Sequence, residues 1–443
     1  MGLTRYPEDI ARAVFSKVKK GNDIFPSKDI LIELFEILYF ASIRTEEAEP
    51  IIFNIVYLDP NNPDPDPPKR KVRDRWGYVE FSKQIELNIP NVIKLAKASD
   101  PRSSSLAIFH GENDELMIWG LIDQGNRYHD YVNHELEEGP ERPGIFQASI
   151  EGPGFLVAYI EYQKIAELRV NRIIRKTVDV FSKGPIRDAL EIGINRHLEL
   201  VQNEVEKNVY SDRDHWDNSL TQHWFASICR ILLRIKSYKH GGALLISGGR
   251  ATRGLNIKYR ILYNRLTDAL IQRGVKLVEL SYVSDQIYEY LEEEIPTDLY
   301  LDENVTGTEL NSIRSEIDGS LWFISLLSRV DGLVLLSKHL SVRGFGVEIK
   351  STKTPDVVYK SSTQVPSESG LQEVDYNYFG TRHRSMMRYC WSYPGSVGFV
   401  VSQDGDIRAM TRYDDKLIIW DNIKLQAYTF IRRSLRRRRK PSK

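Results

Sequence analysis

The chain has 443 residues and equal numbers of basic and acidic side chains, 61 of each, so its formal charge is zero. Without net charge the chain creates no overall field that attracts nucleic acid, and we expect no general nucleic-acid partner. Hydrophobic residues make up 41% of the sequence, which is enough for buried cores, and the length predicts two or three domains. The basic segment 431–443 is typical of a solvated tail, with nucleic-acid or phosphate binding as the alternative.

The remaining global features favour a cytoplasmic protein. The N-terminal stretch MGLTRYPEDIARAVFSKV carries scattered charges and no apolar core, so it does not resemble a secretory signal. No apolar run is long enough to span a bilayer, and we expect no membrane partner. Cys229 and Cys390 are far apart in apolar, helical patterns and are expected to be reduced core residues.

Residues 1–185 predict a mixed α/β domain. A helix is expected from the apolar stripe formed by Ile30, Leu34, Ile37 and Leu38, followed by a buried strand at IIFNIVYL. The segments SLAIFHGENDELMIWGLID and FQASIEGPGFLVAYIEY each predict two strands joined by a turn. An amphipathic helix and polar linker at 186–214 then lead into the second half.

Residues 215–430 predict a central, mostly buried sheet with helices on its faces. A helix at TQHWFASICRILLRIKSY and a strand at HGGALLIS come first. A helix from Leu255 to Arg273, capped by Gly274, and a strand at VKLVEL are expected next. A third helix carries apolar residues from Leu310 to Ile324 at helical spacing. Four strands follow, at VDGLVLLS, GVEIKS, VGFVVSQDG and KLIIWD.

The first candidate for chemistry is Asp331. It precedes a strand and has apolar neighbours, which predicts a buried carboxylate that must be paired, hydrogen-bonded or bound to a metal. The alternative is an aspartate that caps a turn and uses the backbone freedom of Gly332.

The second candidate is the run Gly380–Arg384, GTRHR, ahead of an apolar helix pattern. Unpaired N–H groups at the start of a helix favour anions, and arginine donates two hydrogen bonds to phosphate oxygens. Three cations in a row repel one another, so the pattern predicts a site for a polyphosphate. The alternative is a set of surface ion pairs with Glu373 and Asp375.

The third candidate is the strand end VVSQDG, which contains Ser402 and Asp404. It is either an ordinary turn or part of a metal–nucleotide site shared with Asp331 and GTRHR, since ligands in α/β sheets gather at strand ends. The glycine-rich GGRATRG lacks the spacing of known phosphate loops, and the histidines show no zinc-ligand spacing.

These motifs in this order resemble the diadenylate cyclase domain of the DNA-integrity scanning protein type. The matching stretches are GGALLI at 241–246, DGL at 331–333, GTRHR at 380–384 and VSQD at 401–404, within residues 215–430. The resemblance implies a twisted mixed sheet flanked by helices. It also implies an enzyme that condenses two ATP into cyclic di-AMP and two pyrophosphates with Mg²⁺ or Mn²⁺. Such an enzyme is at least a homodimer with facing sites.

The same resemblance assigns roles to residues. Asp331 and Asp404 would bind the metal, and Asp331, Arg382, His383 and Arg384 would be catalytic. The nucleotide would be bound by Gly332, Leu333, Gly380, Thr381, Arg382, His383, Arg384 and Ser402. The sequence departs from the family at Leu333, where alanine is usual, at Gln403-Asp404, which replaces an acidic pair, and in a longer segment around 250–300.

The first half is similar to predicted sensor modules fused to such cyclases, on the basis of IRTEEAEP, LMIWGLID and GPGFLVAYIEYQKIAELR. That similarity implies an unknown ligand that controls the second half. Because of Leu333 and Gln403, two alternatives stay open: a nucleotide-binding sensor without turnover, and a cyclase that makes a different cyclic dinucleotide.

Overall fold

The computed structural model describes residues 5–17, 25–63, 76–100, 103–111, 115–123, 145–160, 163–174, 177–205, 213–248, 253–290 and 295–425. The chain divides into two compact units, 1–176 and 177–443, called unit 1 and unit 2 below. Each contains helices and a mixed sheet, which confirms the predicted α/β class. The described helices include none that is both long and apolar enough to cross a bilayer. The predicted basic tail, 431–443, lies outside the described residues.

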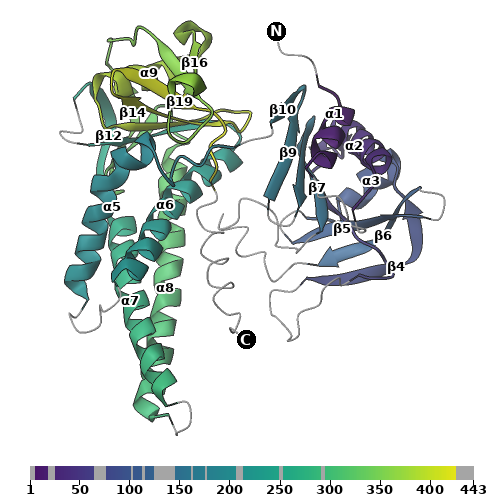
Figure 1. Ribbon diagram of the computed structural model, residues 1–443, viewed down its shortest axis with the longest axis horizontal. Helices are drawn as coiled ribbons and strands as arrows, with labels where there is room; N and C mark the ends of the chain where they lie inside the picture. Colours follow the sequence, from purple (N-terminus) through teal and green to yellow (C-terminus); the bar gives the residue numbers. More distant parts are fainter. Residues whose placement is uncertain are drawn as a thin grey trace. The chain divides into compact units, whose positions relative to one another are not determined.

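Unit 1 is built on an eight-stranded sheet in the order β10-β9-β8-β7-β3-β5-β6-β4 (Figure 1). β3 and β5 run parallel, whereas the other described neighbours run antiparallel. The strands are β3 Phe53–Tyr57, β4 Gly77–Glu86, β5 Ser104–His110, β6 Leu116–Asp123, β7 Phe146–Gly152, β8 Phe155–Ile160, β9 Gln163–Arg169 and β10 Arg172–Ile174. A small separate pair is formed by β1 Thr45–Glu46 and β2 Glu49–Pro50.

Three helices cover one face of this sheet: α1 Pro7–Phe15, α2 Lys28–Ser42 and α3 Ile89–Ala96. α2 begins where the Ser27 hydroxyl accepts a hydrogen bond from the Ile30 amide, and it buries Leu34 and Leu38 as its stripe predicts. The strand at IIFNIVYL and both predicted strand pairs are confirmed as β3, β5–β6 and β7–β8.

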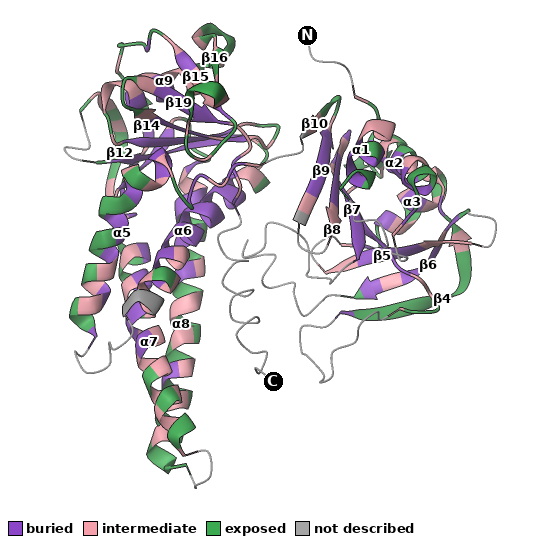
Figure 2. Ribbon diagram, in the orientation of Figure 1, coloured by how far each residue is buried: buried purple, intermediate pink, exposed green. Residues whose placement is uncertain are grey.

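Unit 2 is built on a nine-stranded sheet in the order β12-β14-β13-β11-β17-β18-β19-β15-β16. The strands are β11 Gly242–Ser247, β12 Leu255–Tyr263, β13 Leu333–Ser337, β14 Val342–Ile349, β15 Val358–Ser361, β16 Leu371–Val374, β17 Val397–Val401, β18 Ile407–Tyr413 and β19 Lys416–Trp420. The central strands β11, β13 and β17 are buried along their whole length. Figure 2 shows that buried residues of unit 2 gather in the sheet and on the parts of the helices next to it.

Helices lie on both faces of the unit 2 sheet. Because strand side chains alternate, Leu244 and Ile246 of β11 pack against α5, α6, α7 and α8, while Ala243 and Leu245 pack against α9. The helices are α5 Pro185–Glu204, α6 Arg213–Ser237, α7 Arg265–Glu289, α8 Thr297–Leu327 and α9 Thr381–Ser392. The predicted sheet between helices is therefore confirmed, and both Cys229 and Cys390 are buried core residues.

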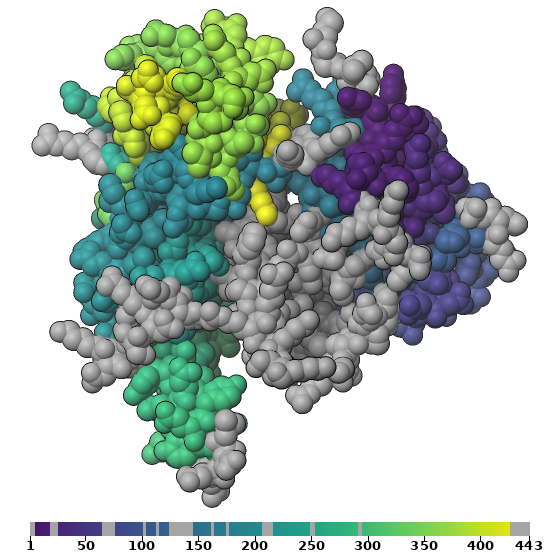
Figure 3. All heavy atoms as spheres, in the orientation of Figure 1, coloured from purple at the N-terminus to yellow at the C-terminus, as the bar shows by residue number. Residues whose placement is uncertain are grey.

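The segment between β11 and β13 differs from the prediction. The expected helix from Leu255 is the edge strand β12, and the expected strand VKLVEL lies inside α7, which continues past Gly274. α7 and α8 form a long antiparallel hairpin whose distal part extends beyond the rest of unit 2 (Figure 3). The segment around 250–300, which the resemblance marks as longer than usual, thus contains β12 and α7, the first helix of this hairpin.

The helix after residue 185 belongs to unit 2. The division at 176 falls before the boundary of 185 expected from the sequence, and Ile186, Leu190 and Ile194 of α5 lie in the unit 2 core. α5 approaches β13 closely at Gly193, where a Cβ atom would lie 1.9 Å from the Lys338 carbonyl oxygen. α5 is therefore a packed element of unit 2 and more than a connector.

Candidate functional site

The sheet of unit 2 brings three of the sequence motifs to one edge. β11 runs antiparallel to β17, with Gly242 opposite Val401, and parallel to β13. The starts of β11 and β13 and the end of β17 therefore lie on the same side of the sheet, where strands begin or end. We call this row of strand ends the candidate edge. Asp331, just before β13, and Ser402, just after β17, stand two strand spacings apart, about 10 Å.

GTRHR opens α9, as the sequence predicts. Gly380 has extended backbone angles and is the N-cap, and α9 begins at Thr381. The helix packs on β17 and β18 through Met386, Met387 and Cys390. Gly398 on β17 makes room for this contact, since a Cβ atom there would lie 2.3 Å from Met386 Cγ.

Arg382 links the motifs most directly. Gly241, with φ +73°, precedes β11, and a Cβ atom on it would lie 2.9 Å from both Arg382 Nη1 and the Val401 carbonyl oxygen. The same atom would lie 3.3 Å from the Gln403 amide nitrogen. The exposed Arg382 guanidinium thus stands where β11 begins and β17 ends, beside the turn that carries Ser402 and Asp404.

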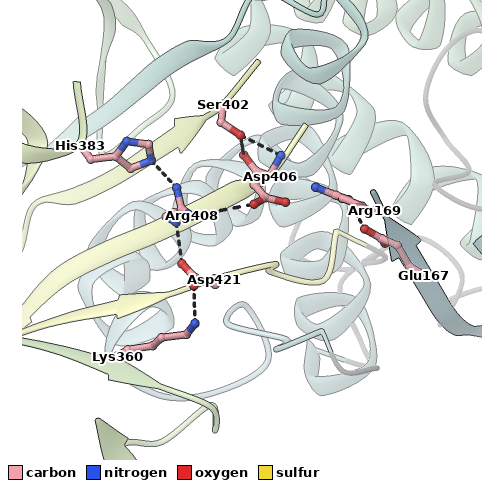
Figure 4. A network of polar contacts seen from close by, with 8 residues as sticks. All are labelled: Glu167, Arg169, Lys360, His383, Ser402, Asp406, Arg408 and Asp421. Atoms are coloured by element: carbon pink, nitrogen blue, oxygen red, sulfur yellow. Dashed lines mark hydrogen bonds and ion pairs between the residues drawn. The ribbon is translucent and has the colours of Figure 1, made fainter. Parts of the chain in front are cut away.

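His383 is held by a network that the sequence analysis missed (Figure 4). Arg408 Nη1 of β18 lies 2.9 Å from His383 Nε2, and Arg408 Nε donates to Asp421 Oδ1 at 2.6 Å. Lys360 Nζ lies 2.5 Å from the other carboxylate oxygen of Asp421. The network joins α9 to the candidate-edge ends of β18, β19 and β15.

His383 is neutral at pH 7. Burial, then the positive charges of Arg408 and Arg382, lower the pKa of its imidazole to about 4, although Asp421 acts in the opposite direction. Arginine is always a donor, so His383 Nε2 accepts the hydrogen bond from Arg408 and the ring proton is on Nδ1. GTRHR therefore carries two cations and a neutral hydrogen-bond donor, which corrects the expectation of three cations.

The Asp421 carboxylate stays ionised beside its two basic partners. Burial acts to raise its pKa, but the charges and hydrogen bonds of Arg408 and Lys360 outweigh burial and lower it. These partners come from strands far apart in the sequence. The one feature of the sequence that could have indicated this network is that Asp421 directly follows the apolar strand KLIIW.

Asp331 differs from its prediction, because it is exposed and not buried. The turn before β13 places it on the surface of the candidate edge, next to Gly332, which has φ +114°. A Cβ atom on Gly332 would lie 2.6 Å from the backbone of Gly346, so this position requires glycine. Leu333 follows with 5% of its surface exposed and packs in the core beneath α9.

Ser402 and Asp404 lie on a tight turn between β17 and β18. The Ser402 hydroxyl accepts a hydrogen bond from the Asp406 amide at 3.1 Å and donates to the Asp406 carbonyl oxygen at 3.3 Å. Ser402 therefore holds the turn, and Asp404 is exposed at its tip. The ordinary turn that the sequence offered as an alternative at VVSQDG is therefore present, and it places the Asp404 carboxylate at the candidate edge.

The described residues contain no group of three or more histidine, cysteine or acidic side chains arranged to hold a metal by themselves. The carboxylates at the candidate edge fit Mg²⁺ or Mn²⁺ that is bound together with a substrate. Such ions commonly bind through one or two carboxylates together with substrate phosphates, and Asp331 and Asp404 offer two exposed carboxylates on one edge. Arg382 and Arg384 form no ion pairs with Glu373 or Asp375 within the described part of the chain.

Comparison with known proteins adds one match. No curated protein matches the chain. Residues 21–123 match the family model described as "Probable sensor domain DACNV", and this stretch spans α2 to β6 of unit 1. Unit 1 therefore contains a probable sensor domain.

Proposed function

We propose that unit 2 is a metal-dependent diadenylate cyclase and that unit 1 is its sensor. The observation that carries the proposal is the meeting of Gly241, Arg382 and the Ser402–Asp404 turn at the edge that also bears Asp331. The order of the four cyclase-like motifs and the sensor match in unit 1 support the same assignment. Mixed sheets host many activities, so the assignment depends on this site and not on the fold.

The reaction joins two ATP molecules head to tail. The ribose 3′-oxygen of each ATP forms a bond to the α-phosphorus of the other, the bond to the bridging oxygen breaks, and pyrophosphate leaves. The two hydroxyl protons pass to solvent. Each protomer holds one ATP, so two candidate edges must face each other in a homodimer or a larger assembly.

The chain's own residues bind and align the triphosphate. Arg382 and Arg384 supply positive charge at the start of α9, where free N–H groups and the Thr381 hydroxyl add further donors. His383 donates from Nδ1 while Arg408 fixes its ring, so it binds a phosphate oxygen without adding charge. These donors hold the α-phosphate in line for attack.

The carboxylates of Asp331 and Asp404 would hold Mg²⁺ or Mn²⁺ against the substrate phosphates. When bound, the ion neutralises charge at the α-phosphate and lowers the cost of forming the 3′-alkoxide. Gly380 leaves open space beside the nucleotide, Gly332 would lie near the base, and Ser402 fixes the turn that carries Asp404. The buried Leu333 lies under this region and influences which base fits.

A release assay for pyrophosphate with ATP and Mn²⁺ tests the proposal. Asp331→Asn and Arg382→Gln are expected to lower the rate at least about a hundredfold, because the first removes a metal-binding carboxylate and the second removes a cation that contacts the reacting phosphates. Both residues are exposed, so the variants should fold as the wild type does.

Two matched controls lie at the opposite sheet edge. Asp414→Asn changes an exposed aspartate in the β18–β19 turn, and Arg265→Gln changes an exposed arginine in the first turn of α7. Both should release pyrophosphate at the wild-type rate. If Asp331→Asn is as fast as the wild type, the assigned mechanism is wrong.

A second candidate is a nucleotide sensor with the same site and no turnover, which Leu333 and Gln403 favour. It predicts that the wild type binds ATP but releases no pyrophosphate under any metal condition. A related outcome is pyrophosphate release from another nucleotide at a higher rate than from ATP, which would identify a different cyclic dinucleotide.

A further inference from the structure

Unit 2 contains a cavity of about 890 Å³ at the sheet edge opposite to the candidate edge. β11 and β13 are parallel and in register there, with Ser247 beside Ser337 at the last position of each strand. Both serines are buried and line the cavity. Each of these strands therefore has the candidate edge at its start and the cavity at its end.

The titratable side chains among the described residues of the lining are all basic. They are Arg260, Lys338, His339 and Arg343, and no carboxylate of the described residues lines the cavity. Within the described part of the chain, the side chains of Arg260, Lys338 and Arg343 make no hydrogen bond or ion pair. Uncompensated cations around one cavity favour an anionic occupant.

Lys338 lines the cavity close to Gly248 and Gly395. A Cβ atom on Gly248 would lie 2.4 Å from Lys338 Cε, and one on Gly395 would lie 3.6 Å from Lys338 Nζ. A side chain at position 248 would therefore displace the end of the Lys338 side chain from this position. Burial lowers the pKa of Lys338, and burial together with Arg196, Arg343 and Lys338 lowers the pKa of His339, so a bound anion would stabilise both charged forms.

The rest of the lining is apolar and open. Ile192 and Leu262 have exposed fractions of 62% and 64%, and Pro394 lies on the same rim. An occupant that combined phosphate with a ring would cover these side chains and reach the basic groups. The volume falls within the range of about 300–1,000 Å³ that is typical of sites for nucleotide-sized ligands.

We propose that this cavity binds a phosphate-bearing small molecule of nucleotide size, with its phosphates on Lys338 and Arg343 and its ring on Ile192 and Leu262. The site is separate from the candidate edge and does not depend on unit 2 being a cyclase. The buried strands β11 and β13 run from the candidate edge to the cavity, so they connect a ligand in the cavity to the candidate edge.

Calorimetry with the full chain tests the site, with ADP and inorganic pyrophosphate as probes. The background variant is Arg382→Gln, which weakens phosphate binding at the candidate edge. Lys338→Gln and Arg343→Gln, singly and together, remove the proposed phosphate contacts. Arg265→Gln with Lys416→Gln removes two charges elsewhere in unit 2 and is the matched control.

We expect the background variant and the control to bind ADP, with pyrophosphate competing for the same site. Each cavity variant should bind ADP about tenfold more weakly, since a charge-assisted hydrogen bond is lost. Arg343 is exposed, so Arg343→Gln keeps its fold and remains informative if the double variant is unstable. Absence of ADP binding in the background variant, or equal ADP affinity in Arg343→Gln and the control, would overturn the proposal.

Discussion

The surroundings of His383 in the fold determine its charge and its hydrogen bonding. From the sequence it is one of three consecutive cations, but in the fold it is half-buried and accepts a hydrogen bond from Arg408. Two arginines and a neutral donor can bind a triphosphate without the mutual repulsion of three positive charges. Arg408 is thereby a positioning residue for His383 in the proposed reaction.

Replacing Arg408 by glutamine should raise the pKa of His383 from about 4, because one of the nearby positive charges is lost. The pKa should stay below 6.5, since burial is the larger cause of the shift. An NMR titration of the histidine ring measures this directly, with Arg265→Gln as the control. An unchanged His383 pKa in Arg408→Gln would show that the hydrogen bond does not form in solution.

At the element scale, hydrophobic periodicity predicted most of the buried elements and failed in one segment. The strands β3, β11, β13, β17 and β19 are buried apolar runs, and their sequences indicate this plainly. β12 is an edge strand with mostly exposed side chains, and its sequence LNIKYRILY alternates apolar and polar residues, a strand pattern that the prediction of a helix overlooked. VKLVEL looks like a strand because Gly274 precedes it, yet that glycine lies inside α7.

Gly274 has a packing role that explains its presence in a helix. A Cβ atom there would lie 2.7 Å from Val201 Cγ2 and 3.0 Å from Leu220 Cδ2, so glycine lets α7 pack closely on α5 and α6. No pattern within the local sequence carries this information, because Val201 and Leu220 belong to other helices.

Gly274→Ala should lower the free energy of unfolding by about 1–3 kcal/mol, since the added methyl overpacks the contact between the helices. Gly319→Ala in α8 is the matched control, because a Cβ atom there has nothing within 4 Å. The control should be neutral or stabilising by up to about 1 kcal/mol, as alanine favours helix. Urea unfolding of both variants measures the difference, and equal stabilities would contradict the packing role.

The sequence predicted the motifs of the candidate site, but it did not predict the contacts between them. The order of the motifs indicated Asp331, GTRHR and the Ser402–Asp404 turn, and strand order places them along one edge. The neutral state of His383, its contact with Arg408 and the exposure of Asp331 depend on tertiary contacts between distant strands. Local sequence does not encode those contacts in a form that periodicity or spacing can reveal.

At the scale of the whole molecule, the chain combines two units that have separate hydrophobic cores. The probable sensor domain lies in unit 1 and the proposed cyclase in unit 2. A ligand bound to unit 1 can therefore stabilise the core of unit 1 without changing the packing around the candidate edge. In the proposed arrangement, unit 1 regulates a catalytic unit that has its own sheet and core.

Unit 2 should lose stability in mild acid. Burial lowers the pKa of His197 to about 4 and that of His223 to about 3, so both are neutral in the fold. Below pH 6.5 these histidines are protonated in the unfolded chain but not in the folded chain. The free energy of unfolding therefore falls as the pH drops towards 4. Each such histidine contributes about 1.4 kcal/mol per pH unit in that range.

His197→Gln should make this pH dependence shallower by the contribution of one proton. Urea unfolding followed between pH 7 and pH 4 by tryptophan fluorescence measures the slope, because Trp224 lies buried in the same core. Parallel curves for the variant and the wild type would show that His197 is not held neutral.

Product analysis decides whether the candidate edge makes cyclic di-AMP, as we propose. The full chain is incubated with ATP and Mn²⁺ or Mg²⁺, and the products are separated by chromatography with mass detection, beside Asp331→Asn and Asp414→Asn. We expect cyclic di-AMP from the wild type and from Asp414→Asn and none from Asp331→Asn. Equal amounts of product from Asp331→Asn, or ATP bound by the wild type without any product, would rule out the proposed cyclase.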